Sequence, residues 1–147
     1  DIVKSRIGLA ARAQIITPDQ NIADEYRKLD TYDVIIADEA QFFTPAQIDQ
    51  LRALVDEDDI PVLCFGLRTD FLTHLFPGSQ RLLELSDSLT EIKTVCACGR
   101  KATVNARIDE AGRVITQGDQ VFLGGNDSYV AMCHKCWVDK IKAQQEK

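Results

Sequence analysis

Two short apolar runs on either side of a helix-forming segment constrain the fold more than any other feature of the sequence. The first run occupies residues 33–38 and the second occupies residues 60–66. Runs that are apolar throughout are typical of strands covered on both faces, as in a parallel sheet. The order strand, helix, strand therefore predicts a βαβ unit in an α/β fold.

Polar and aromatic residues follow each predicted strand. The first strand leads into the letters DEAQFF (38–43), and the second leads into GLRTDF (66–71). In open parallel sheets, ligands bind beyond the carboxyl ends of the strands. We therefore expect the functional site where these two segments leave the sheet.

Two segments begin with the same helix-start signal, a Thr-Pro pair with a glutamine three residues after the threonine. The threonines are Thr17 and Thr44, and the glutamines are Gln20 and Gln47. This spacing predicts an N-cap closed by a capping box, with proline at the first helical position. Apolar residues recur at helical spacing after both signals, so we predict two amphipathic helices.

The sequence changes character near residue 91. Strand-like composition predicts strands in segments 91–95 and 102–108 and two further short strands within 113–125, before a polar C-terminal helix. This pattern describes a small β-rich lobe bounded by cysteines. We therefore divide the chain into a partial α/β nucleotide-binding core, 1–92, and a second domain with the C-terminal helix, 93–147.

Four of the five cysteines form two close pairs at the two ends of this lobe: Cys96, Cys98, Cys133 and Cys136. Two such pairs brought together by the intervening chain are typical of a four-sulfur structural zinc site. Disulfides and free thiols remain alternatives, and His134 is a competing ligand beside Cys133. Four thiolates leave no open coordination position, so zinc would fasten a loop and activate no water. Cys64 is expected to be a small buried apolar residue.

The overall charge and hydropathy exclude some classes of protein. A formal net charge of −6 argues against a dedicated nucleic-acid binder, which needs a basic surface. No apolar run approaches the roughly 20 residues that cross a bilayer, and no signal-peptide pattern is present. Because paired cysteines without a secretory signal favour metal binding, we expect a cytoplasmic protein.

Asp38 and Glu39 are the first candidates for chemistry. A carboxylate at the end of a hydrophobic strand commonly holds Mg²⁺ in phosphate-binding α/β proteins, and a neighbouring carboxylate can act as a base. The alternative is that both residues only begin a loop and cap the next helix.

Six segments together resemble the type II, zinc-containing thymidine kinases, especially the bacterial branch. They read SRIGL (5–9), IADEAQFF (36–43), IPVLCFGLRTDF (60–71), LFPGSQRLLELSD (75–87), TVCACGRKA (94–102) and GGNDSYVAMCHKC (124–136). The resemblance implies a P-loop-type parallel sheet core and a zinc-bound lasso domain. Members of the family begin with a glycine-rich P-loop, and no G-x-x-x-x-G-K-[ST] motif occurs here. We therefore expect that an N-terminal segment is missing and that this chain alone is a poor kinase.

The same resemblance implies an activity and roles for the acidic segment. The expected reaction is ATP-dependent phosphorylation of thymidine to thymidine 5′-monophosphate, a step of deoxynucleotide salvage. Glu39 would be the general base, Asp38 would orient Mg²⁺, and Asp38, Glu39, Ala40 and Gln41 would lie along the ATP phosphates.

The resemblance also implies a thymidine-binding set. The family positions correspond to Phe42, Leu67, Phe71, Phe76, Asn105, Val121, Gly124, Gly125 and Tyr129. Phe42 and Phe71 could instead be plain core aromatics, and Phe76 could simply anchor a turn. Family members form homotetramers and are inhibited by thymidine triphosphate, so we expect both properties here, with no nucleic-acid or membrane partner.

A helicase-like ATPase is the rival interpretation. The letters DEAQ resemble its metal-binding box, and a zinc ribbon on such a core would bind nucleic acid. The acidic charge and the lack of interleaved basic and aromatic residues in the β-rich lobe argue against it.

Overall fold

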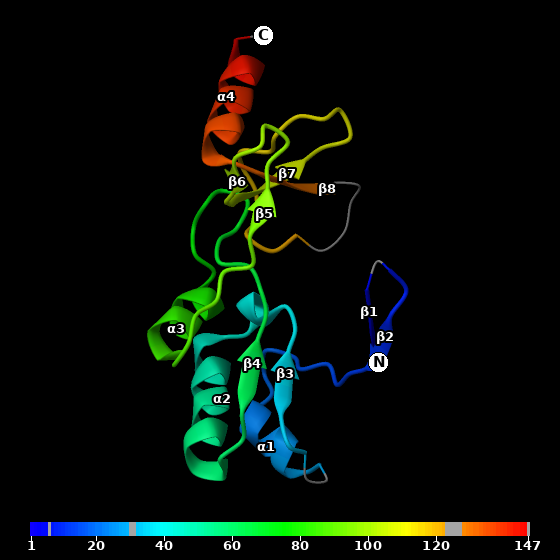
Figure 1. Cartoon of the computed structure of the whole chain (residues 1–147), viewed down its shortest axis with the longest axis vertical. Helices are drawn as coiled ribbons and strands as arrows, with labels where there is room; N and C mark the ends of the chain where they lie inside the picture. The colour runs from blue at the N-terminus through cyan, green and yellow to red at the C-terminus, as the bar shows by residue number, and fades with distance from the viewer. Residues whose placement is uncertain (6, 30–31, 123–127, 147) are drawn as a thin grey trace.

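The structure is a computed structural model that describes residues 1–5, 7–29, 32–122 and 128–146 of the 147-residue chain. A unit of helices and parallel strands occupies one end of a long molecule, and a β-rich lobe occupies the other (Figure 1). The mixed α/β class predicted from the sequence is confirmed. The division at residue 92 stays a prediction.

A parallel pair of strands lies at the centre of the α/β unit. Strand β3 (Ile35–Ala37) pairs with β4 (Val62–Cys64), and helix α2 (Pro45–Asp58) connects them. This arrangement confirms the predicted βαβ unit. Both strands are shorter than the predicted runs at both ends, covering 35–37 of the predicted 33–38 and 62–64 of the predicted 60–66.

One face of the β3–β4 pair is covered and the opposite face is exposed. Helix α1 (Ile22–Arg27) and α2 bury the first face in a core of Ile22, Ala23, Ile48, Leu51 and Leu54. On the opposite face, 67% of Ile36 and 45% of Leu63 are exposed. The expectation of strands buried on both faces is therefore wrong for the described residues, since the described helices pack on only one of them.

The two predicted helix starts have different outcomes. At α2 the capping box is present, with the Thr44 side chain accepting from Gln47 N and the Gln47 side chain accepting from Thr44 N. At α1 the prediction is wrong, because the helix begins at Ile22 and Asn21 is its N-cap. The hydroxyl of Thr17 donates to an aspartate instead of accepting from a helical N–H.

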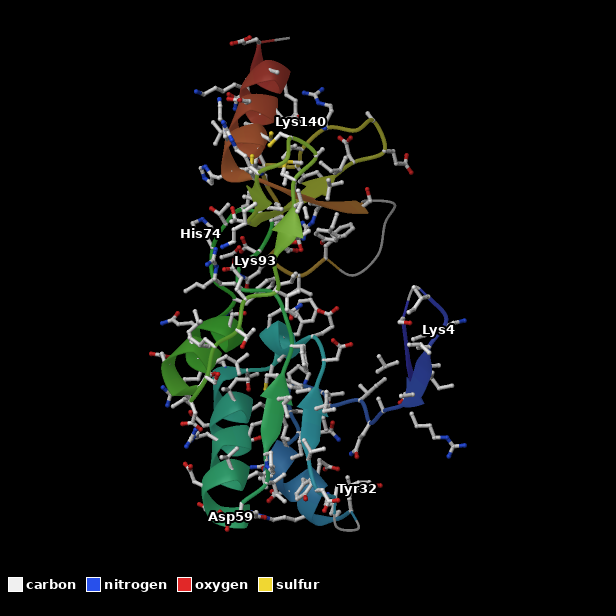
Figure 2. The ribbon with its side chains drawn as sticks, viewed as in Figure 1. Lys4, Tyr32, Asp59, His74, Lys93 and Lys140 are labelled. Atoms are coloured by element: carbon white, nitrogen blue, oxygen red, sulfur yellow. The ribbon has the colours of Figure 1, made fainter. Side chains whose placement is uncertain are left out.

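Helix α3 (Pro77–Leu85) follows β4 and packs against the short 3₁₀ helix η1 (Ala40–Phe42). Residues His74 and Lys93 lie at the level where the α/β unit meets the β-rich lobe (Figure 2). At the N-terminus, β1 (Ile2–Lys4) and β2 (Ala10–Arg12) form an antiparallel hairpin that stands to one side of the unit (Figure 1).

The lobe consists of two antiparallel strand pairs and the C-terminal helix. Strand β5 (Thr94–Val95) pairs with β6 (Lys101–Ala102), and β7 (Val104–Ile108) pairs with β8 (Ser128–Met132). Helix α4 (His134–Gln145) follows, with the Cys133 side chain accepting from Cys136 N at its start.

The two short strands expected within 113–125 are not formed in the described residues up to 122. Only a single bridge, between Ile108 and Val114, is present there. Side chains bind two backbone groups of this segment: Arg107 Nη2 donates to Asp119 O, and Gln144 Oε1 accepts from Val114 N. The remainder of the predicted strands, residues 123–125, lies outside the described residues.

The helices of the described residues are all too short or too polar to cross a membrane.

Candidate functional site

The acidic segment follows β3 at the end of the sheet that faces the β-rich lobe (Figure 1). The backbone bond from Phe65 N to Ala37 O and the bond from Ala40 N to Phe65 O, each 2.9 Å, continue the β3–β4 contact beyond the ladder. Between them, Glu39 has a positive φ of 51°. This left-handed conformation turns the chain sharply, and the Glu39 side chain is left exposed.

Hydrogen bonds order both carboxylates. Asp38 Oδ1 accepts from Glu39 N at 2.9 Å. Gln41 Nε2 donates to Glu39 Oε2 at 2.6 Å, and Gln41 is only 2% exposed. The remaining polar atom of the Gln41 side chain, Oε1, accepts from Leu67 N at 3.1 Å. The ends of β3 and β4 are therefore joined through a side-chain amide.

Two glycines allow the acidic segment to pack closely on its neighbours. A Cβ at Gly66 would lie 2.5 Å from Gln41 Oε1, and one at Gly78 would lie 2.4 Å from Phe43 O. Both distances are shorter than van der Waals contact allows. The backbone of residues 40–43 is therefore held between the loop after β4 and the first turn of α3.

Aromatic side chains line the region beside the carboxylates. Phe42 and Phe76 form an edge-to-face pair with ring centroids 5.7 Å apart. Phe76 is buried, whereas half of Phe42 is exposed. Leu67 is also exposed. Its N–H donates to the Gln41 side chain, and its carbonyl accepts from the Ser79 hydroxyl.

A buried arginine of the lobe packs on Phe71, an aromatic residue in the segment after β4. Arg107 of β7 is 2% exposed, and its guanidinium carbon lies 3.8 Å from the Phe71 ring centroid. The rings of Phe122 and Tyr129 lie at 5.2 and 5.6 Å. Arg107 Nε also donates to the Tyr129 hydroxyl at 3.0 Å, and Nη2 donates to Asp119 O at 3.1 Å. Phe71 and Tyr129, both predicted site residues, are thus brought together by a residue that was not predicted.

A second connection lies beside the first, and we call it the Asp70–Gln120 bridge. Gln120 Nε2 donates to Asp70 Oδ2 at 2.9 Å and to Leu75 O at 3.2 Å. The buried Asp70 also accepts from the backbone N–H groups of Leu72 and His74. The bridge joins the turn after β4 to the loop that precedes Val121.

The other predicted thymidine-binding positions belong to the lobe. Asn105 is half-buried in β7, opposite Ala131 of β8. Val121 is exposed in the loop held by Arg107 and the Asp70–Gln120 bridge. Gly124 and Gly125 lie outside the described residues.

The two cysteine pairs come together as predicted. The sulfurs of Cys96, Cys98, Cys133 and Cys136 all lie within 4.8 Å of one another, and the Cys98 and Cys133 sulfurs are 3.6 Å apart. Zinc bound tetrahedrally to thiolates at about 2.3 Å requires sulfurs about 3.8 Å apart, so the donor set fits zinc. His134 is not part of the cluster; its ring packs on Trp137 with centroids 5.5 Å apart.

The pKa values of the clustered thiols are shifted in different directions. The backbone N–H groups of Cys98 and Cys133 lower the pKa of the Cys96 thiol to about 6. The neighbouring Cys133 side chain raises the pKa of the Cys136 thiol to about 12. Four crowded sulfurs cannot all ionise without a cation, and a divalent metal ion would supply that charge.

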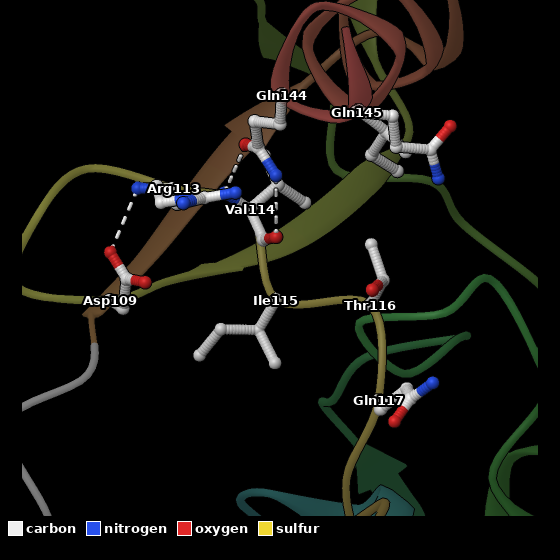
Figure 3. A pocket seen from close by; sticks show the side chains of 9 residues that line it. Asp109, Arg113, Val114, Ile115, Thr116, Gln117, Gln144 and Gln145 are labelled. Atoms are coloured by element: carbon white, nitrogen blue, oxygen red, sulfur yellow. Dashed lines mark hydrogen bonds between the residues drawn. The ribbon is translucent and has the colours of Figure 1, made fainter. Parts of the chain in front are cut away.

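A pocket lies between α4 and the segment after β7. Gln144 of α4 binds both backbone groups of Val114 at its rim, accepting from N at 2.6 Å and donating to O at 3.1 Å (Figure 3). Its lining mixes polar side chains with Val114, Ile115 and Ile141, and Asp109 accepts from Arg113 N within it. These contacts attach α4 to the lobe.

Comparison with known proteins gives consistent matches. The family model described as thymidine kinase matches residues 1–137. A thymidine kinase of Yersinia pestis is 48% identical over 145 residues, which cover 96% of this chain and 74% of that protein. The thymidine kinase of Escherichia coli K12 is 46% identical, covering 99% and 75%. That of Vibrio vulnificus CMCP6 is 50% identical, covering 90% and 71%.

Proposed function

Because the chain belongs to the thymidine kinase family, we propose that its site serves phosphoryl transfer from ATP to thymidine. The family resemblance drawn from the six sequence motifs is confirmed by the family match and by the relatives. The helicase-like alternative is not favoured, since the named relatives are all kinases.

The observation that supports this proposal best is the position of Glu39 at the carboxyl end of β3, where its carboxylate is exposed and oriented by hydrogen bonding. In the proposed step, the 5′-hydroxyl oxygen of thymidine bonds to the γ-phosphorus. The hydroxyl proton passes to Glu39, and the bond from the γ-phosphorus to the bridging oxygen of ADP breaks. Proton transfer of this kind typically contributes about 10²–10⁴ in rate.

We propose that Asp38 helps to hold Mg²⁺ and that residues 38–41 lie along the ATP phosphates. Asp38 is suited to this role because it is exposed, and among the described residues only its Oδ1 is engaged, by Glu39 N. The metal would neutralise negative charge on the phosphates while the γ-phosphoryl group is transferred to the acceptor.

The thymine ring would bind among the aromatic side chains. Phe42 and Leu67 offer exposed apolar surface, and Phe71 and Phe76 are buried. The loop containing Val121 would supply backbone groups to the ring edge, with Asn105 and Tyr129 as further contacts. Gly124 and Gly125 stay a prediction from the family resemblance.

Zinc is proposed as the ion of the four-cysteine cluster, with a structural role. The cluster joins the turn between β5 and β6 to the end of β8, so the ion would fix both ends of the chain between Cys98 and Cys133. A homotetramer, feedback inhibition by thymidine triphosphate and a cytoplasmic location remain proposals that come from the family resemblance.

A binding experiment tests the substrate assignment independently of turnover. Thermal unfolding is followed with thymidine, with cytidine as the matched nucleoside, and with single-stranded DNA. At 100 times its dissociation constant, a ligand of the folded state stabilises it by about 2.7 kcal/mol, which corresponds to a rise of about 5–10 °C in Tm. Thymidine should give this rise and cytidine should not. Stabilisation by DNA and not by thymidine would refute the assignment, and so would a Tm that neither nucleoside changes.

A further inference from the structure

The side chain of Gln41 is fixed at both ends of its amide. Leu67 N donates to Oε1 at 3.1 Å, so this atom is the carbonyl oxygen of the amide. The other end is therefore the NH₂ group, and it donates to Glu39 Oε2 at 2.6 Å. Both partners agree on one orientation of the amide.

The surroundings of Gln41 prevent the amide from turning over. The side chain is 2% exposed, and its Oε1 lies where a Cβ at Gly66 would be only 2.5 Å away. A reversed amide would direct NH₂ at Leu67 N–H, two donors facing each other. Because a buried donor that faces another donor loses its hydrogen bond, the observed orientation is strongly preferred.

The orientation of the Glu39 side chain, in contrast, is restrained by little besides Gln41 among the described residues. The Glu39 side chain is exposed, its backbone is in the left-handed region, and its own N–H is bound to Asp38 Oδ1. A free glutamate side chain samples several rotamers. Among the described residues, Gln41 is the one side chain that hydrogen-bonds to the Glu39 carboxylate.

We propose that Gln41 is a positioning residue for the reaction: its NH₂ group engages Glu39 Oε2 and thereby leaves Oε1 directed at the acceptor hydroxyl. The proposal rests on the proposed function, in which Glu39 is the general base. Gln41 does not take a proton itself. It reduces the number of carboxylate orientations, and a base displaced by about 1 Å can lose about 10²-fold in rate.

Two substitutions separate the two ends of the amide. Gln41→Glu keeps an acceptor for Leu67 N and replaces the donor to Glu39 with a second carboxyl group, so the contact with the base is lost and the two acids repel each other or share a proton. Gln41→Met, of similar length, loses both contacts. We expect each to lower kcat by about 10–100-fold. Gln41→Glu keeps the bond to Leu67, a proposed thymidine contact, so the KM for thymidine should change less than about twofold; Gln41→Met loses that bond and should raise the KM as well.

Gln47 is the matched control. It is also a glutamine with 2% exposure, and its NH₂ group donates to the carbonyls of Thr17 and Gln20. It lies in α2, on the core side, and has no bond to Glu39. Gln47→Met should lower the thermal stability and leave kcat of the folded enzyme within about twofold of the unsubstituted protein.

The decisive experiment is a double-mutant cycle in the intact enzyme, using transfer of radiolabelled phosphate to thymidine. If Gln41 acts through Glu39, Gln41→Glu should cause no further loss of kcat in a Glu39→Gln background. An equal loss in both backgrounds would overturn the positioning role while leaving Glu39 as the base. Full activity of Glu39→Gln would instead overturn the proposed function of Glu39, so the two failures are distinguishable.

Discussion

The Asp70–Gln120 bridge should contribute measurably to the attachment of the lobe to the α/β unit. Gln120→Met keeps the length of the side chain and removes both of its hydrogen bonds, one to the Asp70 carboxylate and one to Leu75 O. A bond to a charged group is worth about 1.5–3 kcal/mol and a neutral one about 0.5–1.5 kcal/mol. Gln120 is only half-buried, so water compensates in part, and we expect a loss of about 1–3 kcal/mol in the free energy of unfolding.

The pairwise energy can be isolated by adding Asp70→Asn. The amide introduced by this substitution would still accept from the backbone N–H groups of Leu72 and His74 through its oxygen, but its NH₂ group would face that of Gln120. Urea unfolding of the two single variants and the double variant then gives a coupling energy, which we expect to be about 1–2 kcal/mol. Far-UV circular dichroism follows the whole chain, and fluorescence of the single tryptophan, Trp137, follows the lobe.

The same variants should weaken thymidine binding. Gln120 immediately precedes Val121, so loss of the bridge leaves a predicted substrate loop to be ordered on binding. Ordering one backbone residue costs about 1–2 kcal/mol, which corresponds to a rise in Kd of about tenfold. A coupling energy below about 0.3 kcal/mol, together with unchanged affinity, would refute the idea that the bridge holds this loop in solution.

Treatment with a strong chelator, or Cys133→Ser, should lower Tm. Either change should also alter the fluorescence of Trp137, because this residue packs on the cysteine cluster. An unchanged Tm would contradict a structural role for the proposed ion. Gly78→Ala should destabilise the protein by about 1–3 kcal/mol in urea unfolding, because its Cβ would lie 2.4 Å from a backbone carbonyl, whereas Gln80→Ala on the exposed face of α3 should have little effect. Leu54→Ala, at a fully buried position in the core of the α/β unit, should cost about 2–5 kcal/mol, and a loss below about 1 kcal/mol would show that this core is not close-packed.

Local signals in the sequence predicted the parts of the fold that depend on neighbouring residues. The capping box at Thr44 formed because every group it needs lies within a single helical turn. The same letters at Thr17 form only half of the box, with Gln20 Oε1 accepting from Thr17 N, and the helix begins later, at Ile22. Gln47 reaches across from α2 and binds the carbonyls of Thr17 and Gln20, a contact 30 residues away that no local signal reveals.

The groups that organise the site could not be predicted from the sequence. Arg107 stands in a strand with alternating character, where a charged side chain normally faces solvent, yet it is buried against Phe71. The partners Asp70 and Gln120 are 50 residues apart, and no spacing rule connects them. The cysteine cluster was predictable because metal ligation requires particular residue types in pairs.

At position 39, the residue that best suits the left-handed backbone differs from the residue that the proposed chemistry requires. A residue with a Cβ pays about 1 kcal/mol or more to hold this conformation, and glycine would adopt it freely. Selection for heat resistance alone would therefore favour glycine at position 39 and discard the carboxylate. Any engineering of this chain toward higher thermostability should keep that position fixed, because the most stable variant and the most active one are expected to differ there.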